Sequence, residues 1–172
     1  MPRHHRTTSG RPDPSRVLEV LGDAGATLAT AESLTGGRLA AALAAVPGAS
    51  ASFRGGVVAY ASDLKVSLLG VPEEVAARVG VVSAECAAAM AEGVRTLTAS
   101  TYGVATTGVA GPTEQEGKPV GTVFVAVAGP GGTRSLALEL TGDREAVVER
   151  TVGEALGALL AAIPGAEEPG LR

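Results

Sequence analysis

The segment Ala29–Gly37 places a serine where a nucleophile can be activated. It is a polar stretch between an apolar run typical of a strand and an alanine-rich run typical of a helix. The first amides of a helix have no partner within it and carry about half a positive charge, so they can hold a developing oxyanion. Ser33 would stand in front of them, and Gly36 and Gly37 would let a ligand approach the backbone. In the simpler interpretation, which spacing alone favours, Ser33 or Thr35 only caps the helix.

A tyrosine and a lysine follow the next predicted strand. Tyr60 ends that strand and Lys65 lies five residues later, near the edge where open α/β sheets bind ligands. The only histidines of the chain, His4 and His5, lie in a predicted leader, so a serine nucleophile would need another base. A partly desolvated lysine with a lowered pKa can serve. Taken alone, Lys65 is more simply interpreted as a solvated surface residue.

Two further segments could bind a sugar or a phosphate. Thr106 and Thr107 end a predicted strand and are followed by Gly108 in a glycine-rich loop, which could also be only a turn. Arg144 lies where a strand passes into a helix, and its guanidinium could contact a phosphate in bidentate fashion. An exposed arginine in the first turn of a helix is the simpler interpretation.

Length and composition predict one domain. The chain has 172 residues, and we expect a domain over 15–163 between a disordered leader, 1–14, and a loose tail, 164–172. Hydrophobic residues make up 45% of the chain but aromatic residues only 2%, so the core must be built from alanine, valine and leucine. Strands that alternate with helices early in the chain, and a hairpin later, predict an α/β fold with helices on both faces of a mixed sheet.

The same numbers argue against several classes of function. Acidic residues outnumber basic ones 18 to 14, so no nucleic-acid partner is expected. Cys86 is the only cysteine, which excludes an intramolecular disulfide and a thiolate metal cluster. With no histidine in the domain, we expect no metal and no cofactor. No apolar run reaches membrane-spanning length and no secretory signal is present, so we expect a cytoplasmic protein without a membrane partner.

Hydrophobic periodicity and turn residues set the expected elements. The expected helices cover 17–24, 35–46, 64–69, 72–79, 84–97 and 143–162, and the expected strands cover 26–30, 53–60, 104–107, 120–128 and 135–140. Pro130-Gly131-Gly132 predicts a hairpin turn between the last two strands. The alanine-rich helix 84–97 could pack against a second copy, so we also expect a homodimer.

Five blocks, in this order, resemble the C-terminal domain family of the competence/damage-inducible protein CinA. They are AESLTGG (31–37), YASDLKVSLLGV (60–71), TGVAGP (107–112), KPVGTV (118–123) and GDR (142–144). The resemblance covers about 17–162 and implies a three-layer α/β/α sandwich. It also implies a metal-independent nicotinamide-nucleotide amidase, which converts nicotinamide mononucleotide to nicotinate mononucleotide and ammonia. Longer members carry a separate N-terminal domain, and we expect a standalone form here.

The resemblance assigns roles to residues of this sequence. Ser33 would be the nucleophile, Lys65 its proton acceptor, and Tyr60 would assist proton transfer. The candidates for substrate binding are Thr35, Gly36, Gly37, Thr106, Thr107, Gly108 and Arg144, with Arg144 at the phosphate. Backbone amides near 34–37 would stabilise the oxyanion.

The loop after Gly111-Pro112 departs from the family pattern. Members commonly carry a Gly-Gly pair there, whereas this loop is shorter and contains Glu114 and Glu116. These carboxylates would repel a phosphate if they faced the substrate, so the loop bears directly on substrate preference. A catalytically inactive nucleotide-binding or regulatory member of the family is the alternative function. A DNA-associated competence factor gains little support from the net charge of −4.

Overall fold

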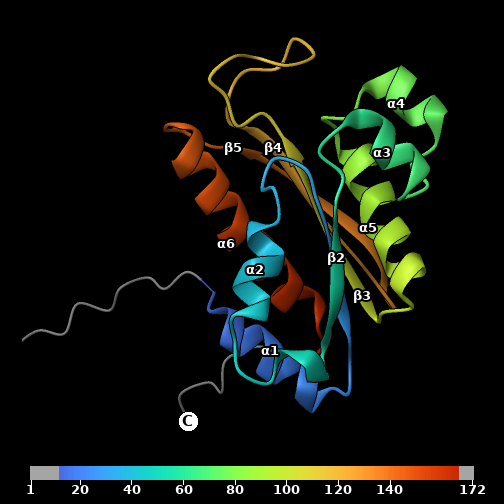
Figure 1. Cartoon of the computed structure of the whole chain (residues 1–172), viewed down its shortest axis with the longest axis vertical. Coiled ribbons are helices and arrows are strands. Elements are labelled where there is room, and N and C mark those ends of the chain that lie inside the picture. The colour runs from blue at the N-terminus through green and yellow to red at the C-terminus, as the bar shows by residue number, and fades with distance from the viewer. Residues whose placement is uncertain (1–11, 167–172) are drawn as a thin grey trace, which may run out of the picture.

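The computed structural model describes residues 12–166, which form a mixed five-stranded sheet (Figure 1). Its strands are β1 (Leu28–Glu32), β2 (Phe53–Val58), β3 (Tyr102–Gly108), β4 (Thr122–Gly129) and β5 (Gly132–Glu139). The spatial order is β2-β1-β3-β4-β5. Strands β2, β1 and β3 run parallel, and β4 and β5 continue the sheet antiparallel. The carboxyl ends of the three parallel strands therefore meet at one edge of the sheet.

Helices cover both faces of this sheet (Figure 1). The α-helices of the described part are α1 (Pro14–Asp23), α2 (Arg38–Ala44), α3 (Ser62–Ser67), α4 (Glu73–Val79), α5 (Ala84–Thr98) and α6 (Arg144–Ala162), and a 3₁₀ turn spans Ala49–Ala51. α1, α2 and α6 lie on one face, while α3, α4 and α5 lie on the other (Figure 1). The predicted three-layer α/β/α sandwich with a mixed sheet is confirmed.

The two faces of the sheet differ in side-chain size. Toward α1, α2 and α6 the strands β3 and β4 present mainly valines, among them Val104, Val123 and Val125. Toward α5 the same strands present alanines, such as Ala105 and Ala126. Small side chains let α5 approach closely, so the fold needs few aromatic residues in its core.

Several element boundaries differ from the prediction. The helix expected from Thr35 begins only at Arg38, because Gly36 and Gly37 have positive φ angles of 57° and 99° and turn the chain before the helix. β1 runs on to Glu32, which brings Ser33 directly after the strand. The predicted hairpin is confirmed, since Gly129 pairs with Gly132.

The termini of the predicted domain are only partly described. Residues 1–11 of the expected leader and 167–172 of the expected tail lie outside the described residues. α1 begins at Pro14, three residues before the expected helix, because Asp13 accepts a hydrogen bond from the amide of Ser15 and caps it. Within 12–166, no helix is both long and apolar enough to cross a membrane.

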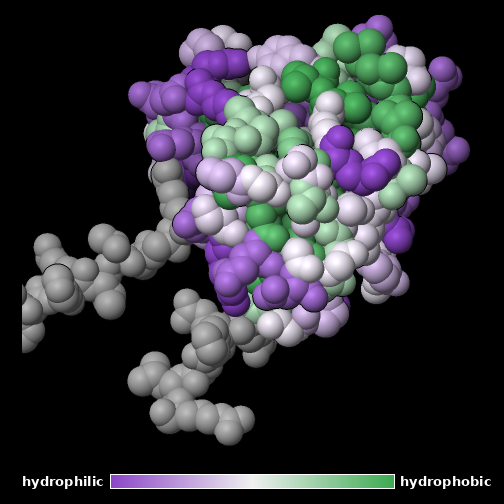
Figure 2. All heavy atoms as spheres, turned by 60° about the horizontal axis from the view of Figure 1, so that its bottom comes forward, coloured by the Kyte–Doolittle hydropathy of each residue, from purple (hydrophilic) through white to green (hydrophobic). Residues whose placement is uncertain are grey.

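The alanine-rich side of α5 does not face outward. Ala87, Ala91 and Cys86 are completely buried against the chain's own sheet. Exposed apolar residues gather on part of the surface (Figure 2). Leu68, which follows α3, and Leu97 of α5 are exposed apolar side chains that line a common hollow. The expected homodimer stays a prediction, since Ala84, Ala88 and Ala89 of the same helix are only half-buried.

Candidate active site

Ser33 lies at the carboxyl end of β1, in the first residue after the strand. Its amide donates to the carbonyl of Thr106 at 3.0 Å, which extends the pairing with β3 by one bond. Its own carbonyl accepts from the amide of Gly36 at 3.0 Å and closes a tight turn. The side chain is only 9% exposed. The serine is thus held by backbone bonds on both sides.

The amino end of α2 does not face the serine as an open anion site. The carboxylate of Glu32 accepts hydrogen bonds from the amides of Leu39 at 2.9 Å and Ala40 at 3.0 Å. This buried carboxylate occupies the free amides of the helix, which are the strongest anion-binding feature of a helix end. Glu32 thus takes the amides of Leu39 and Ala40, whereas the expected oxyanion donors, the backbone amides near 34–37, stay a prediction. Among them, the amide of Leu34 belongs to a residue that lines the cavity, and it has no acceptor within 12–166.

Lys65 reaches Ser33 from α3. Its Nζ lies 3.1 Å from Ser33 Oγ and 2.8 Å from the carbonyl oxygen of Ala59, and it donates to both. The side chain is 1% exposed, and no carboxylate within the described residues forms an ion pair with it. Burial lowers the pKa of Lys65, while Cys86 and Glu116 raise it more weakly. A lysine in this setting loses its proton more readily than one in water.

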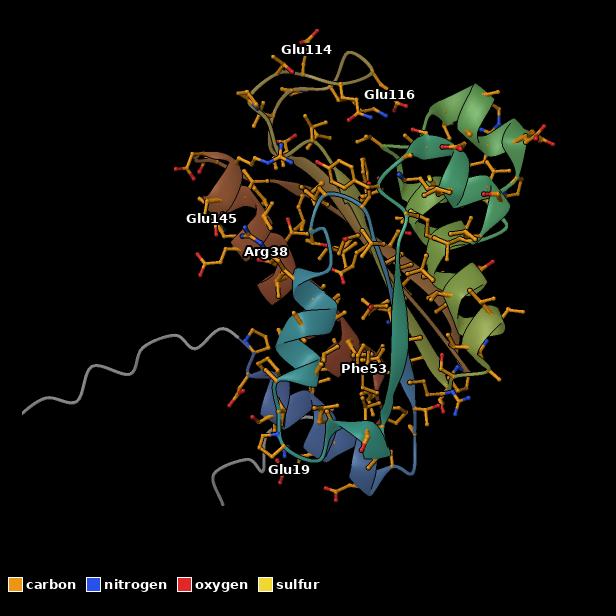
Figure 3. All side chains as sticks on the ribbon, viewed as in Figure 1. Glu19, Arg38, Phe53, Glu114, Glu116 and Glu145 are labelled. Carbon is orange, nitrogen blue, oxygen red and sulfur yellow. The ribbon has the colours of Figure 1, made fainter. Side chains whose placement is uncertain are left out.

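Tyr60 and Arg144 meet at the opening of the same cavity. Arg144 Nη2 donates to the Tyr60 hydroxyl at 2.6 Å, and Nη1 donates to the carbonyl of Gly111. An ion pair between Arg38 and Glu145, at 2.6 and 2.9 Å, links α2 to the start of α6 (Figure 3). This ion pair lies one residue from Arg144, so it helps to set the position from which the guanidinium reaches the cavity.

The cavity in front of Ser33 has a volume of about 230 Å³. Its lining comes from five parts of the fold, and the lining residues are Ser33, Leu34, Tyr60, Lys65, Val81, Val82, Thr107, Gly108, Val109, Ala110, Gly111, Thr113, Glu114, Gln115 and Arg144. Ligand pockets commonly hold about 300–1,000 Å³. The cavity therefore fits part of a small molecule, and the rest would extend past the exposed Tyr60 side chain.

Sequence reasoning named ten site residues, and the structure brings six of them to this cavity. These six are Ser33, Tyr60, Lys65, Thr107, Gly108 and Arg144. The other four, Thr35, Gly36, Gly37 and Thr106, lie outside its lining. Thr35 and Thr106 are buried and share a hydrogen bond of 2.7 Å between their hydroxyls. This bond ties the serine turn to β3, and a ligand contact of these two threonines stays a prediction.

The predicted site residues leave out several residues at or beside the cavity, among them Glu32, Val81, Val82 and Lys118. Glu32 holds the α2 amides, and Val81 and Val82, in the connection from α4 to α5, form part of the cavity wall. Lys118 contacts the same connection. Glu32 stands inside the AESLTGG block, so the block itself carried a signal. In the sequence, Val81 and Val82 are two apolar residues before a helix, and valine side chains do not indicate the wall of a cavity.

The described residues contain no group of three or more His, Cys, Asp or Glu side chains that could hold a metal ion. Cys86 lies on α5 behind the lysine, and burial raises its pKa to about 11. Its thiol therefore stays protonated at neutral pH.

The protein is thus a three-layer α/β/α sandwich with a buried serine–lysine pair at the carboxyl edge of its parallel strands. Residues 13–163 match the family model of the CinA C-terminal domain, so the chain belongs to that family. A "CinA-like protein" of Frankia casuarinae is 53% identical over 154 residues, covering 88% of this chain and 36% of the relative. One of Gloeobacter violaceus is 58% identical over 123 residues, covering 70% and 28%. The chain thus spans about a third of the length of these curated relatives.

Solved structures support the same assignment. A CinA superfamily protein from Klebsiella pneumoniae superimposes with a TM-score of 0.84 at 39% identity, covering 87% of this chain and 94% of that one. A CinA superfamily protein from Enterobacter cloacae gives 0.89 at 32% identity, covering 95% and 98%. The domain is therefore found as nearly the whole of a crystallised chain as well as within longer proteins.

Proposed function

We propose that the chain is a metal-independent amidohydrolase that hydrolyses the carboxamide of nicotinamide mononucleotide to nicotinate mononucleotide and ammonia. The observation that carries the proposal is the 3.1 Å contact between Lys65 Nζ and Ser33 Oγ at the wall of a cavity. A nucleophile within hydrogen-bond reach of a base of lowered pKa is the arrangement that acyl transfer requires. The choice of substrate rests on the resemblance of the five sequence blocks to the family.

The chemistry begins with the neutral amine of Lys65. In that state the contact reverses, and the Ser33 hydroxyl donates to the lysine nitrogen. As Lys65 takes the proton, Ser33 Oγ bonds to the carboxamide carbon and the carbonyl electrons move to oxygen. The amide of Leu34, which belongs to a lining residue and has no acceptor within 12–166, then donates a hydrogen bond to that oxyanion.

The leaving nitrogen then takes the proton from the Lys65 ammonium group, and the carbon–nitrogen bond breaks to release ammonia. Water attacks the acyl-serine with Lys65 again accepting a proton, which returns to Ser33 Oγ as the acid is released. Tyr60 lies at the cavity with its hydroxyl bound to Arg144. Arg144 supplies the positive charge for the substrate phosphate.

Purified protein incubated with nicotinamide mononucleotide should release ammonia, and Ser33→Ala should release none while keeping the fold. Ser67→Ala is the control, because Ser67 is an exposed serine on α3. If the wild type binds the nucleotide by calorimetry but releases no ammonia, the catalytic proposal fails and a nucleotide-binding or regulatory module takes its place. We place the reaction in the cytoplasm and propose no nucleic-acid or membrane partner.

A further inference from the structure

One wall of the cavity comes from the loop between β3 and β4, which projects beyond the edge of the sheet (Figure 1). Thr113, Glu114 and Gln115 of this loop line the cavity. Val81 and Val82, in the connection between α4 and α5, line it as well. The space in front of Ser33 therefore depends on how the loop sits against that connection.

Glu116 joins the loop to the connection. Its Oε1 accepts from the amide of Val81 at 3.0 Å, and its Oε2 accepts from the amide of Val82 at 3.1 Å. Glu114 lies at the outer end of the loop, whereas Glu116 lies on the side nearer α3 and α4 (Figure 3). The carboxylate of Glu116 is thus engaged by backbone amides, and it is absent from the cavity lining.

Other bonds hold the carbonyls of the same two residues. Thr107 Oγ donates to the carbonyl of Val81 at 2.7 Å, and Lys118 Nζ donates to the carbonyl of Val82. The backbones of Gln115 and Lys118 pair with each other at 3.1 and 2.9 Å, which closes the loop around Glu116. Two loop residues therefore link the loop to the connection: Lys118 donates to the carbonyl of Val82, and Glu116 binds the two amides through a charged, two-pronged acceptor. Lys118 Nζ also lies 3.9 Å from Glu116 Oε2 and forms an ion pair with it.

The local backbone is adapted to this contact. Gly80 has a φ of +81°, and a Cβ at this position would lie 2.3 Å from Glu116 Oε2. Glu116 itself has a φ of 53°, a left-handed conformation that costs energy for a residue other than glycine. Such a conformation persists where surrounding contacts hold it, and the two amide bonds are those contacts.

We propose that Glu116 is a positioning residue, which sets the distance between the β3–β4 loop and the Val81–Val82 wall and so places the substrate carboxamide before Ser33. The proposal rests on the proposed function, because its kinetic test requires turnover of nicotinamide mononucleotide. It also assigns a task to the loop at which this sequence departs from the family pattern. A substrate displaced by about 1 Å can lose about a hundredfold in rate, so a wall of this kind matters for turnover.

The test compares Glu116→Ala and Glu116→Gln with Glu139→Gln. Glu139 is an exposed carboxylate at the end of β5, it lies outside the cavity lining, and no hydrogen bond of its side chain is seen within 12–166. We expect kcat/KM for nicotinamide mononucleotide to fall about ten- to hundredfold in Glu116→Ala, less in Glu116→Gln, and to stay unchanged in Glu139→Gln. Equal effects at positions 116 and 139 would overturn the proposal.

A pH profile separates positioning from a general loss of structure. Among the groups around Lys65, Cys86 of α5 and Glu116 of the loop raise its pKa. Removing the Glu116 charge should shift the acidic limb of kcat/KM, if at all, to lower pH, and Glu139→Gln should leave the limb in place. A loss of kcat/KM that persists on the plateau above the limb is the mark of positioning, and a loss confined to the limb would count against the proposal.

Hydrogen exchange tests the proposal without any turnover. The amides of Val81 and Val82 should exchange faster in Glu116→Ala than in the wild type, with amides of β3 unchanged as the internal reference. If the wild type proves inactive, the proposed function fails, while faster exchange together with weaker calorimetric binding of the mononucleotide would still support the positioning role. Unchanged exchange would overturn it. Glu116→Gln keeps one acceptor oxygen, so the same exchange measurement is made on this variant if Glu116→Ala does not fold.

Discussion

Lys65 Nζ lies 3.1 Å from Ser33 Oγ although 32 residues separate them in the chain. The two side chains meet because β1 and β2 are parallel neighbours, so the residues that follow each strand emerge at the same edge. The carbonyl of Ala59, just after β2, accepts the second bond of the lysine at 2.8 Å and fixes its direction. The pair is thus a product of sheet topology, and its protonation can be tested directly.

Activity should depend on the neutral form of Lys65. Because burial lowers the pKa of Lys65 below its ordinary 10.5, we expect kcat/KM to rise with pH along a limb whose midpoint lies below that value. Lys65→Arg keeps a positive charge but cannot lose it, and Lys65→Met has no base, so both should lose about 10²–10⁴ in kcat. Stopped assays of ammonia from pH 6 to about 10 would measure this. An arginine variant with near-normal activity would exclude Lys65 as the base.

The same lowered pKa should affect stability. Between the folded pKa and 10.5 the unfolded chain binds more protons at this lysine than the folded chain, so the free energy of unfolding rises with pH across that interval. Lys65→Met lacks this titration. In urea titrations, the free energy of unfolding of the wild type minus that of Lys65→Met should therefore increase with pH and level off above 10.5. A constant difference would mean that the folded pKa is not lowered.

Arg144 should matter for nucleotides and not for nucleosides. Its guanidinium bonds to the Tyr60 hydroxyl and the Gly111 carbonyl at the cavity, where a phosphate can compete for it. Bonds to charged groups contribute about 1.5–3 kcal/mol, so Arg144→Gln should raise KM for nicotinamide mononucleotide about ten- to hundredfold. Nicotinamide riboside, which lacks the phosphate, is the matched substrate and should show little change. Equal losses on both substrates would place the phosphate elsewhere.

The layers of the fold could be predicted because they follow from local patterns: apolar runs and glycine-rich turns indicated the strands and helices. The pair of Ser33 and Lys65 came from the resemblance of the five blocks, since spacing alone favoured a helix cap and a solvated lysine. What the sequence could not predict were the partners of polar groups. The glycines before Arg38 shortened α2, and Glu32 then took the helix amides that Ser33 was expected to face.

The acidic loop shows the same limit. In the sequence, Glu114 and Glu116 lie two positions apart and carry the same charge, yet within 12–166 it is Glu116 whose carboxylate accepts from a pair of backbone amides. Those amides lie 34 and 35 residues earlier in the chain, and no local pattern connects them to the loop. The roles of Thr35 and Thr106 were likewise hidden, because a hydroxyl that bonds to another strand and one that bonds to a ligand look the same in sequence.

Two helical glycines should respond to alanine in opposite directions. In α5, a Cβ at Gly93 would lie 1.8 Å from the carbonyl oxygen of Leu69, so the helix or the turn after α3 must move. In α1, a Cβ at Gly22 would meet nothing within 4 Å. Alanine favours a helix over glycine by about 0.8–1.0 kcal/mol, so Gly22→Ala should raise the free energy of unfolding by roughly that amount.

Gly93→Ala gains the same propensity but must push apart a close contact, and overpacking of this kind costs about 1–3 kcal/mol. We therefore expect it to lower the free energy of unfolding, measured by urea titration beside Gly22→Ala. Because the displaced turn follows the helix that carries Lys65, its kcat should also fall, whereas Gly22→Ala should keep wild-type kcat. Stabilisation by both substitutions would show that α5 does not pack against the turn as closely as the 1.8 Å approach requires.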